Sequence, residues 1–409
     1  MITSTISSPP AFIRTRLTWL AYIMLAYVGF LQAMLGPLMP FLRSELHLSY
    51  TQGGALPGVL AMGLIFSGLF GDKLATRWSR WVIFWGGGLG LAISVVLLSL
   101  SYQFGFVLLA VLGMGFGSSL TQVMIQAVLS DQHGEQRAIA FTEANVAASF
   151  STTLTPLVIG GLQSAGIDWR LVSILAIFFL VSVAAPFYRN VIPDTPSLHP
   201  QSDAKSAQLS LSFWLYWVVL LLLVSVEMSI AVWGTDYLAN NVGLGRAKAA
   251  LAFGTFPAAM LVGRLIGSRL TRRWPSVQFL IFTFAITTVG FPLFWLPHVP
   301  LLNILGLFLT GLGIANQYPL ALSIAVGLAA GQSNQASARA SLGVGMALLA
   351  APLALGGLAD RFSMREAYGI VIILMVAAFL VILFNNRLLN SSKFLANKEK
   401  LQHADFSKD

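Results

Sequence analysis

The chain of 409 residues contains no cysteine, and its histidines are few and scattered. Without cysteine there is no disulfide bond, thiolate metal site, iron–sulfur cluster or cysteine nucleophile. None of the five histidines has the spacing of a metal ligand: His47, His133, His199, His298 and His403. We therefore expect no cofactor, no metal and no redox chemistry. No convergent catalytic set is visible either, so the chain is not expected to be an enzyme.

Charged residues are also scarce. They make up 10% of the chain, whereas about a quarter of the residues of an ordinary soluble domain are charged. Hydrophobic residues make up 56%, and a helix needs about 20 apolar residues to cross the hydrocarbon core. These proportions indicate a membrane protein whose partner is the lipid bilayer. The net charge of +9 then reflects which loops carry the bases, not a nucleic-acid partner.

Apolar runs between the charged residues predict twelve membrane helices. Two runs, Trp81–Ser130 and Trp274–Ala338, are long enough for two helices each, with turns near Ser101–Phe104 and at Pro297–Pro300. The runs lack the two-residue alternation of barrel strands, so we expect an all-α membrane protein. The remaining predicted spans are Leu17–Leu42, Leu46–Gly71, Ala144–Ile167, Leu171–Tyr188, Ser206–Val226, Ala249–Gly263, Ala340–Ala359 and Ala367–Asn386.

Lysine and arginine are distributed unevenly between the two sides of these spans. The two tails and the loops on their side carry 17, and the opposite loops carry 6. Because cytoplasmic loops are enriched in these residues, both termini are expected in the cytoplasm of a cell-membrane protein. The predicted parts are an N-terminal segment (1–16), two six-helix bundles (17–189 and 211–386), a cytoplasmic linker (190–210) and a cytoplasmic tail (387–409). We expect a monomer.

The two bundles contain an internal repeat with an offset of 196 residues. At this offset Gly71-x-Lys73-Leu74-x-x-Arg77-Trp78 aligns with Gly267-x-Arg269-Leu270-x-x-Arg273-Trp274. Gly115-x-Gly117 aligns with Gly311-x-Gly313, and Pro156-Leu157-x-x-Gly160-Gly161-Leu162 aligns with Pro352-Leu353-x-x-Gly356-Gly357-Leu358. The alternative is chance, since glycine, leucine and proline are common in membrane helices. Three matches at one offset favour parallel repeats around an axis along the membrane normal.

With these features the sequence resembles the major facilitator superfamily of secondary transporters over nearly its whole length. The family's loop 2–3 signature is Gly-x-x-x-Asp-[Arg/Lys]-x-Gly-[Arg/Lys]-[Arg/Lys]. Gly68, Asp72, Lys73 and Arg77 match it, whereas Ala75 and Thr76 depart from it. Span 5 has Thr155-Pro156 and then Gly160-Gly161, which departs from the Gly-Pro-x-x-Gly-Gly of family antiporters.

The resemblance implies ion pairs that lock the cytoplasmic side of the closed protein. In the family fold span 2 abuts span 11 and span 5 abuts span 8. We hypothesise that Asp72 pairs with Arg339, and that Glu143 pairs with Arg264 or Arg269. The alternative is that these charges are solvated and have no partner.

Glu227 is the clearest candidate for a functional ion within the membrane, because it follows twenty-one uncharged residues. It could exchange a proton with each side in turn, or it could be a structural acid bonded to another helix. Arg264 is interpreted as part of the gate rather than of the substrate site. Trp233 could contact substrate near Glu227, although tryptophans in this span are more often interface anchors. Asp236, close to the outer end of span 7, is expected to be solvated.

Uncharged polar residues at helical spacing could line a central aqueous cavity. The same residue types also stabilise contacts between helices, so packing is the alternative for each of them. The candidates are Gln32 in span 1, Gln122 and Gln126 in span 4, Asn145 in span 5, and Asn316 and Gln317 in span 10.

These features predict a secondary transporter that moves a small neutral or weakly cationic organic solute, coupled to protons. Export of drug-like amphiphiles is the alternative within this class. A membrane sensor or assembly factor that transports nothing is the alternative outside it.

Overall fold

A computed structural model describes residues 12–189, 209–271, 273–329 and 332–406. Within these ranges the side chains of residues 68–76, 135, 138, 333–334 and 389–406 lie outside the description. The described chain consists of helices joined by short turns. Searched for length and hydropathy, its helices include nine candidate membrane spans and one shorter apolar helix, Leu171–Phe187. The expected class, an all-α membrane protein, is confirmed.

The first half of the chain forms six rods, the first of them bent at Met34. The helices of this half are α1 (Arg16–Ala33), α2 (Leu35–Leu46), α3 (Tyr50–Arg77), α4 (Arg80–Leu100), α5 (Phe104–His133), α6 (Arg137–Ser164) and α7 (Leu171–Phe187), with the short 3-10 turn η1 (Gly134–Gln136) before α6. Side-chain caps set several starts. Thr15 and Thr18 form a capping box at α1, and the Ser79 hydroxyl accepts from Val82 at α4.

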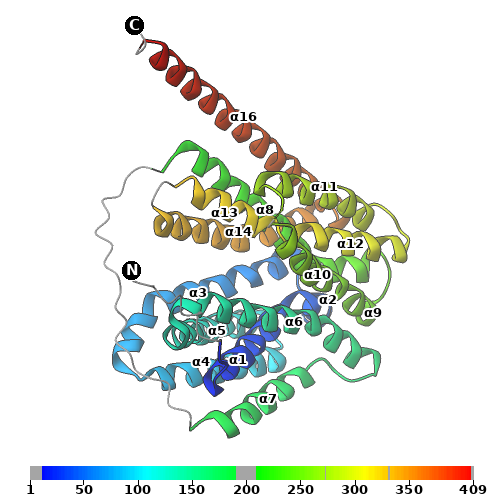
Figure 1. Cartoon of the computed structure of the whole chain (residues 1–409). Coiled ribbons are helices and arrows are strands. Elements are labelled where there is room, and N and C mark those ends of the chain that lie inside the picture. Colours follow the sequence, from blue (N-terminus) through cyan, green and yellow to red (C-terminus); the bar gives the residue numbers. More distant parts are fainter. Residues whose placement is uncertain (1–11, 190–208, 272, 330–331, 407–409) are drawn as a thin grey trace, which may run out of the picture.

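The second half repeats this arrangement, and three of its rods are built from two helices. Its helices are α8 (Leu211–Asn240), α9 (Arg246–Phe253), α10 (Thr255–Leu270), α11 (Ser276–Trp295), α12 (Pro300–Ile314), α13 (Gln317–Gly327), α14 (Ser333–Arg361), α15 (Met364–Ala367) and α16 (Gly369–Phe406). Figure 1 shows most of α8 to α16 in the upper part of the molecule and α1 to α7 in the lower part, with α9 and α10 reaching down to the level of α2 and α6. Most of the predicted linker, 190–210, lies outside the described residues.

Two predicted spans need correction because a charge was taken as the end of a helix. The seventh span does not end at Val226: α8 continues to Asn240, which places Glu227 near the middle of a 30-residue helix. The eighth span extends to both sides of the predicted Ala249–Gly263, so that Arg264 lies within α10. The last predicted span, Ala367–Asn386, agrees with the candidate membrane span Met364–Leu388, and α16 continues beyond it to Phe406.

The internal repeat is visible as equivalent close approaches between helices. A Cβ at Gly115 would meet the Leu60 carbonyl oxygen, and a Cβ at Gly311 would meet that of Phe256, 196 positions after Leu60. Gly117 in turn lies against the carbonyl of Gly87, and Gly313 against that of Thr283. These pairs keep the offset on both partners, so the two halves use the same contacts between their own helices.

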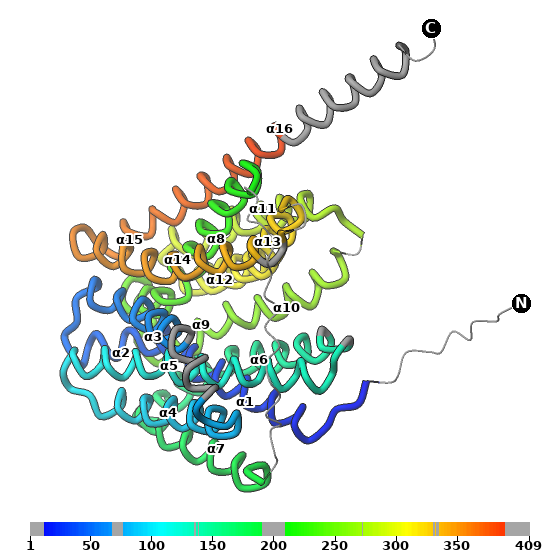
Figure 2. Tube along the Cα trace, turned by 90° about the vertical axis from the view of Figure 1, so that its left-hand side faces the viewer, coloured from blue at the N-terminus to red at the C-terminus, as the bar shows by residue number. Residues whose placement is uncertain are grey.

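The two halves meet mainly at one end of the molecule. We call this the far end; there α2 ends, α3 begins and α8 ends. The opposite end, where α1 and α8 begin, is called the linker end. In Figure 2 the halves lie side by side where α2 and α3 approach α14 and α15. As the family resemblance implies, α3 packs along α14 and α6 packs against α10.

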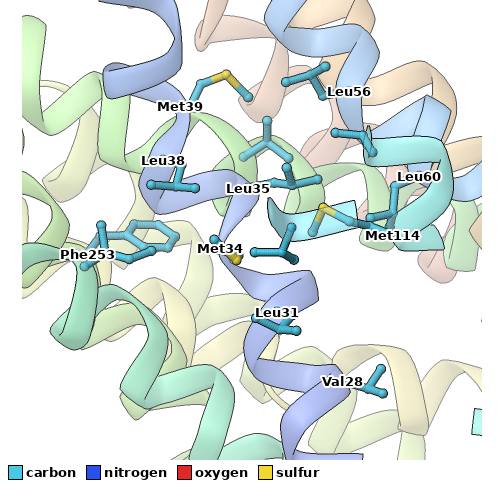
Figure 3. Close-up of a cluster of buried hydrophobic side chains, with 14 of the residues drawn as sticks. Val28, Leu31, Met34, Leu35, Leu38, Met39, Leu56, Leu60, Met114 and Phe253 are labelled. Atoms are coloured by element: carbon cyan, nitrogen blue, oxygen red, sulfur yellow. The ribbon is translucent and has the colours of Figure 1, made fainter. Parts of the chain in front are cut away.

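The apolar core shows the same asymmetry between the ends. One buried cluster joins residues of both halves around the bend at Met34, where Leu38 of α2 lies near Phe253 of α9 (Figure 3). A second cluster contains only second-half residues, among them Phe213 at the start of α8 and Ala336 near the start of α14. Hydrophobic burial therefore joins the halves at the far end, whereas at the linker end each half buries apolar residues of its own, such as Leu20 and Leu129 in the first half and Phe213 in the second.

The glycine contacts predict that bulk at Gly115 prevents folding of the first half. Leucine at this position would overlap the backbone of α3, whose carbonyl cannot move aside without breaking its helix. We expect Gly115→Leu to lower the yield of monodisperse protein in mild detergent severalfold. Gly90→Leu is the matched control, since nothing lies within 4 Å of a Cβ there. Equal yields of the two variants would contradict this packing.

Candidate functional site

A central cavity of about 470 Å³ lies between the two halves. The first half contributes α1, α2, α3, α5 and α6 to its wall, and the second half contributes α8, α9, α10 and α14. Proline and glycine occur in several of these helices at the cavity, such as Gly36 and Pro37 in α2 and Pro156 in α6. A cavity with a wall from each repeat changes shape whenever the halves rotate against one another.

The two walls differ in chemistry. The first half supplies uncharged polar groups: Gln32, Gln122, Asn145, Ser149 and Thr152. Some of their hydrogen-bonding capacity is already used, since Gln32 donates to Ser118 at 2.8 Å and Asn145 donates to the Phe141 carbonyl at 2.8 Å. The second half is mainly apolar but carries both charges of the cavity wall, Glu227 and Arg264.

Glu227 and Arg264 form the charged part of this site. The described residues supply no hydrogen bond to the Glu227 carboxylate, although Arg264 lies near enough to attract it electrostatically. Arg264 donates to the Ser149 hydroxyl at 3.1 Å, a contact from α10 to α6 across the halves. The guanidinium has five N–H donors, so it can also bind a ligand. Arg264 was interpreted as a gate residue, and it also lines the cavity.

Four other predicted site residues do not line this cavity. Gln126 is exposed elsewhere on α5. The Asn316 amide donates to the Gly263 carbonyl at 2.7 Å, and Gln317 donates to Thr287 at 2.8 Å. Trp233 is fully buried and donates to the Pro352 carbonyl at 3.0 Å. For Asn316 and Gln317 the packing alternative describes the contact, because each satisfies a buried polar group between helices. Trp233 was weighed against an interface anchor, and it is instead buried between helices.

The predicted cytoplasmic gate has different contacts in this conformation. Glu143 accepts hydrogen bonds from Arg14 at 2.8 and 2.6 Å and from Tyr22 at 3.0 Å, not from Arg264 or Arg269. The bonds to Glu143 raise the pKa of the Arg14 guanidinium above its usual value. The expected partners Arg269 and Arg339 are exposed, as is Arg77. The side chains of Gly68, Asp72 and Lys73 lie outside the described residues.

The far end is closed by a buried ion pair between the halves. Arg43 of α2 donates from one nitrogen to both carboxylate oxygens of Asp236 in α8, at 2.9 and 3.0 Å. The Asp236 side chain is fully buried and also accepts from Asn240 at 3.1 Å. The Arg43 guanidinium lies 3.3 Å from the centre of the Tyr50 ring, which packs edge-on against Trp233. The expectation that Asp236 is solvated was wrong, because α2 covers it.

A second contact at the far end is a helix cap supplied by the other half. The Asp360 carboxylate, at the end of α14, accepts from the backbone N–H of Tyr50 at 2.8 Å and from that of Thr51 at 2.7 Å. It also accepts from the Thr51 hydroxyl at 2.6 Å. Asp360 thus satisfies N–H groups in the first turn of α3 and places a negative charge at its positive end. Together, Arg43–Asp236 and Asp360 with the start of α3 are called the far-end latch.

Sequence reasoning did not find the far-end latch. Its partners are 193 and about 310 positions apart, and each charge lies near the end of an apolar run, where solvation is the ordinary expectation. The usable signal was that Arg43 and Asp236 both border the same predicted side of the membrane.

The described residues form twelve helical rods in two repeat-related bundles with a partly polar cavity between them, an arrangement typical of membrane transporters. The family described as Major Facilitator Superfamily matches residues 21–299 and 215–406, and the chain therefore belongs to this superfamily. A relative from Sinorhizobium fredii (strain NBRC 101917 / NGR234), named as an uncharacterized transporter, y4wD, is 32% identical over 139 residues. That match covers 34% of this chain and only 37% of the relative.

Solved structures show the same fold at low identity. A bacterial homologue of the human lysosomal transporter Spinster, inward-facing and unoccupied, superposes with a TM-score of 0.75 at 13% identity, covering 91% of this chain and 97% of its own. The nucleoside transporter NupG gives 0.68 at 13%, covering 92% and 99%. A mutant of the peptide transporter POT gives 0.71 at 15%, covering 90% and 94%.

The buried pair predicts a stability difference between two arginines. Arg43→Met leaves the Asp236 carboxylate buried without its cation, which costs about 3–5 kcal/mol of stability at a buried site. Arg14→Met removes the cation bonded to Glu143 within the first half, where both side chains are largely or partly exposed, so this change should cost little stability. Thermal unfolding in detergent should show a much lower Tm for Arg43→Met. Similar Tm values for the two variants would refute the latch.

Proposed function

We propose that the protein is a secondary active transporter that moves a small organic solute across the cell membrane by alternating access. The observation that carries the proposal is the cavity between two repeat-related halves that meet mainly at one end. A rocking motion that opens the far-end latch and closes the linker end would expose the same cavity to the other side. Membership of a superfamily of transporters supports the proposal.

The described conformation corresponds to the inward-facing state, with both termini in the cytoplasm. The bias of lysine and arginine toward the linker end supports this orientation. The resemblance to a Spinster homologue in an inward-facing conformation agrees with it. The predicted locks, Asp72 with Arg339 and Glu143 with Arg264 or Arg269, belong to the opposite, outward-facing state. In that state Glu143 would exchange Arg14 for a base of the second half.

Protons are the proposed coupling ion, and Glu227 is the proposed carrier. Its carboxylate faces the cavity from mid-helix and has no hydrogen-bond partner among the described residues, so protonation breaks no structural contact. Arg264 lines the same cavity and attracts the ionised form of Glu227 electrostatically. A proton gradient drives the transport cycle when Glu227 takes up a proton on one side of the membrane and releases it on the other.

The cavity chemistry sets limits on the solute. One acid and one base among amides and hydroxyls match a polar molecule whose net charge is near zero, which extends the expected neutral or weakly cationic solute to zwitterions. Structural neighbours are named for nucleosides and for peptides, so the shared fold leaves the substrate open. A sensor that transports nothing is the alternative outside this class.

Glu227→Gln tests the coupling. Protein in proteoliposomes that contain a pH-sensitive dye is exposed to a panel of nucleosides, dipeptides, sugars, amino acids and amphiphiles. We expect at least one solute to move protons with the wild type. The glutamine variant should lose this proton movement at least tenfold, because an amide does not ionise, while solute exchange without a gradient persists.

Glu45→Gln is the matched control, since Glu45 lies outside the central cavity and bonds to Arg170 and Trp169. Its proton movement should equal that of the wild type. Normal coupling in Glu227→Gln would remove Glu227 from the mechanism. Folded wild-type protein that moves no solute of the panel would support the sensor instead.

A further inference from the structure

A groove of about 880 Å³ lies beside the central cavity, on the outside of the first half. Its floor is α1, its walls are α6 and α7, and α10 of the second half forms its rim. The lining is almost entirely apolar and includes exposed aromatic rings of Trp19, Phe150 and Phe179. In a bilayer such a groove accepts a hydrocarbon chain.

The groove and the central cavity share a boundary. Helix α6 turns Ser149 and Thr152 toward the cavity and Val146 and Phe150 toward the groove, so that it separates the two spaces. Leu261 of α10 lines both of them. The seam between α6 and α10 therefore lies between cavity and groove. The hydrogen bond from Arg264 to Ser149 crosses this seam one helical turn beyond Leu261.

Charge distribution decides where a polar headgroup would bind. At the linker end of the groove, Glu143 already has both oxygens bonded, to Arg14 and Tyr22. In the central cavity, Glu227 has no bonded partner among the described residues, and Arg264 has N–H donors to spare. A molecule with one cationic and one anionic group fits the cavity, and a chain attached to it fits the groove.

We propose that the substrate is a single-chain zwitterionic amphiphile, with its headgroup at Glu227 and Arg264 and its chain passing between α6 and α10 into the groove lined by Val146 and Phe150. This inference rests on the proposed transport function and names its substrate class. The chain supplies affinity through apolar burial, at about 25 cal/mol per Å², while the headgroup supplies orientation. The amphiphile reaches the cavity sideways from the lipid, through the seam bonded by Arg264 and Ser149.

The test is equilibrium binding to protein in nanodiscs, with binding to empty nanodiscs subtracted. The probes are a radiolabelled alkyl betaine with a chain of about ten carbons and glycine betaine, which has the same headgroup and no chain. We expect saturable binding of the alkyl betaine and at least 100-fold weaker binding of glycine betaine. A cationic and an anionic detergent of equal chain length should each compete at least tenfold less well than unlabelled alkyl betaine.

Two variants distinguish binding in the groove from partitioning of the probe into the lipid. Val146→Trp fills the groove and should weaken alkyl betaine binding at least tenfold. Ile174→Trp places the same ring on an exposed position of α7 that does not line the groove, and should leave binding unchanged. Glycine betaine binding should respond to neither variant.

Equal binding of alkyl betaine by wild type and Val146→Trp would overturn the inference, since the chain would then lie elsewhere. Equal competition by all three headgroup types would overturn it as well and would indicate nonspecific partitioning of hydrocarbon. Proton-coupled movement of another solute by both tryptophan variants would refute this substrate class and leave the proposed transport function standing. If the wild type moves no solute at all, the result counts against the proposed transport function itself.

Discussion

Arg43 and Asp236 pair between the two halves in a region from which water is excluded. Neither partner can stay buried without the other, because a single buried charge costs several kcal/mol. The Tyr50 ring and the Asp360 cap of α3 lie beside it, so polar groups of both halves are satisfied only across the interface. In the described conformation the far end is therefore closed by contacts that need both halves at once.

The remaining architecture combines a symmetric scaffold with an asymmetric cavity. Helix contacts such as Gly115 on Leu60 and Gly311 on Phe256 are repeated at the same offset, and equal contacts allow the halves to move as similar rigid bodies. The cavity wall does not follow the repeat, because amides and hydroxyls come from the first half and both charges from the second. In the proposed transport cycle, symmetry serves the motion, and the departures from symmetry serve recognition and coupling.

Composition and repeat were enough to predict the twelve-rod fold, since the bilayer admits few ways to satisfy a helix backbone. Helix ends were less predictable: Glu227 and Arg264 lie inside helices and face a cavity between the halves, which no local pattern indicates. Asparagine has two uses in this chain: Asn145 faces the cavity, whereas Asn316 bonds a neighbouring helix. The Arg43–Asp236 pair depends on partners brought together only by the tertiary fold.

The absence of cysteine makes the central claim, that one cavity opens to each side in turn, directly measurable. A Cβ at Gly357 would lie 3.7 Å from the Thr51 hydroxyl oxygen, which brings cysteines at these two positions within about the range of a disulfide. Thr152→Cys adds a reporter in the cavity wall. The measurement is the labelling of that reporter by a membrane-impermeant thiol reagent from each face, before and after oxidation of the Thr51→Cys, Gly357→Cys pair. Alternating access predicts that the reporter is labelled from both faces before oxidation and only from the linker-end face afterwards. Reduction should restore labelling from the far-end face. Labelling from the far-end face that persists after cross-linking would contradict alternating access.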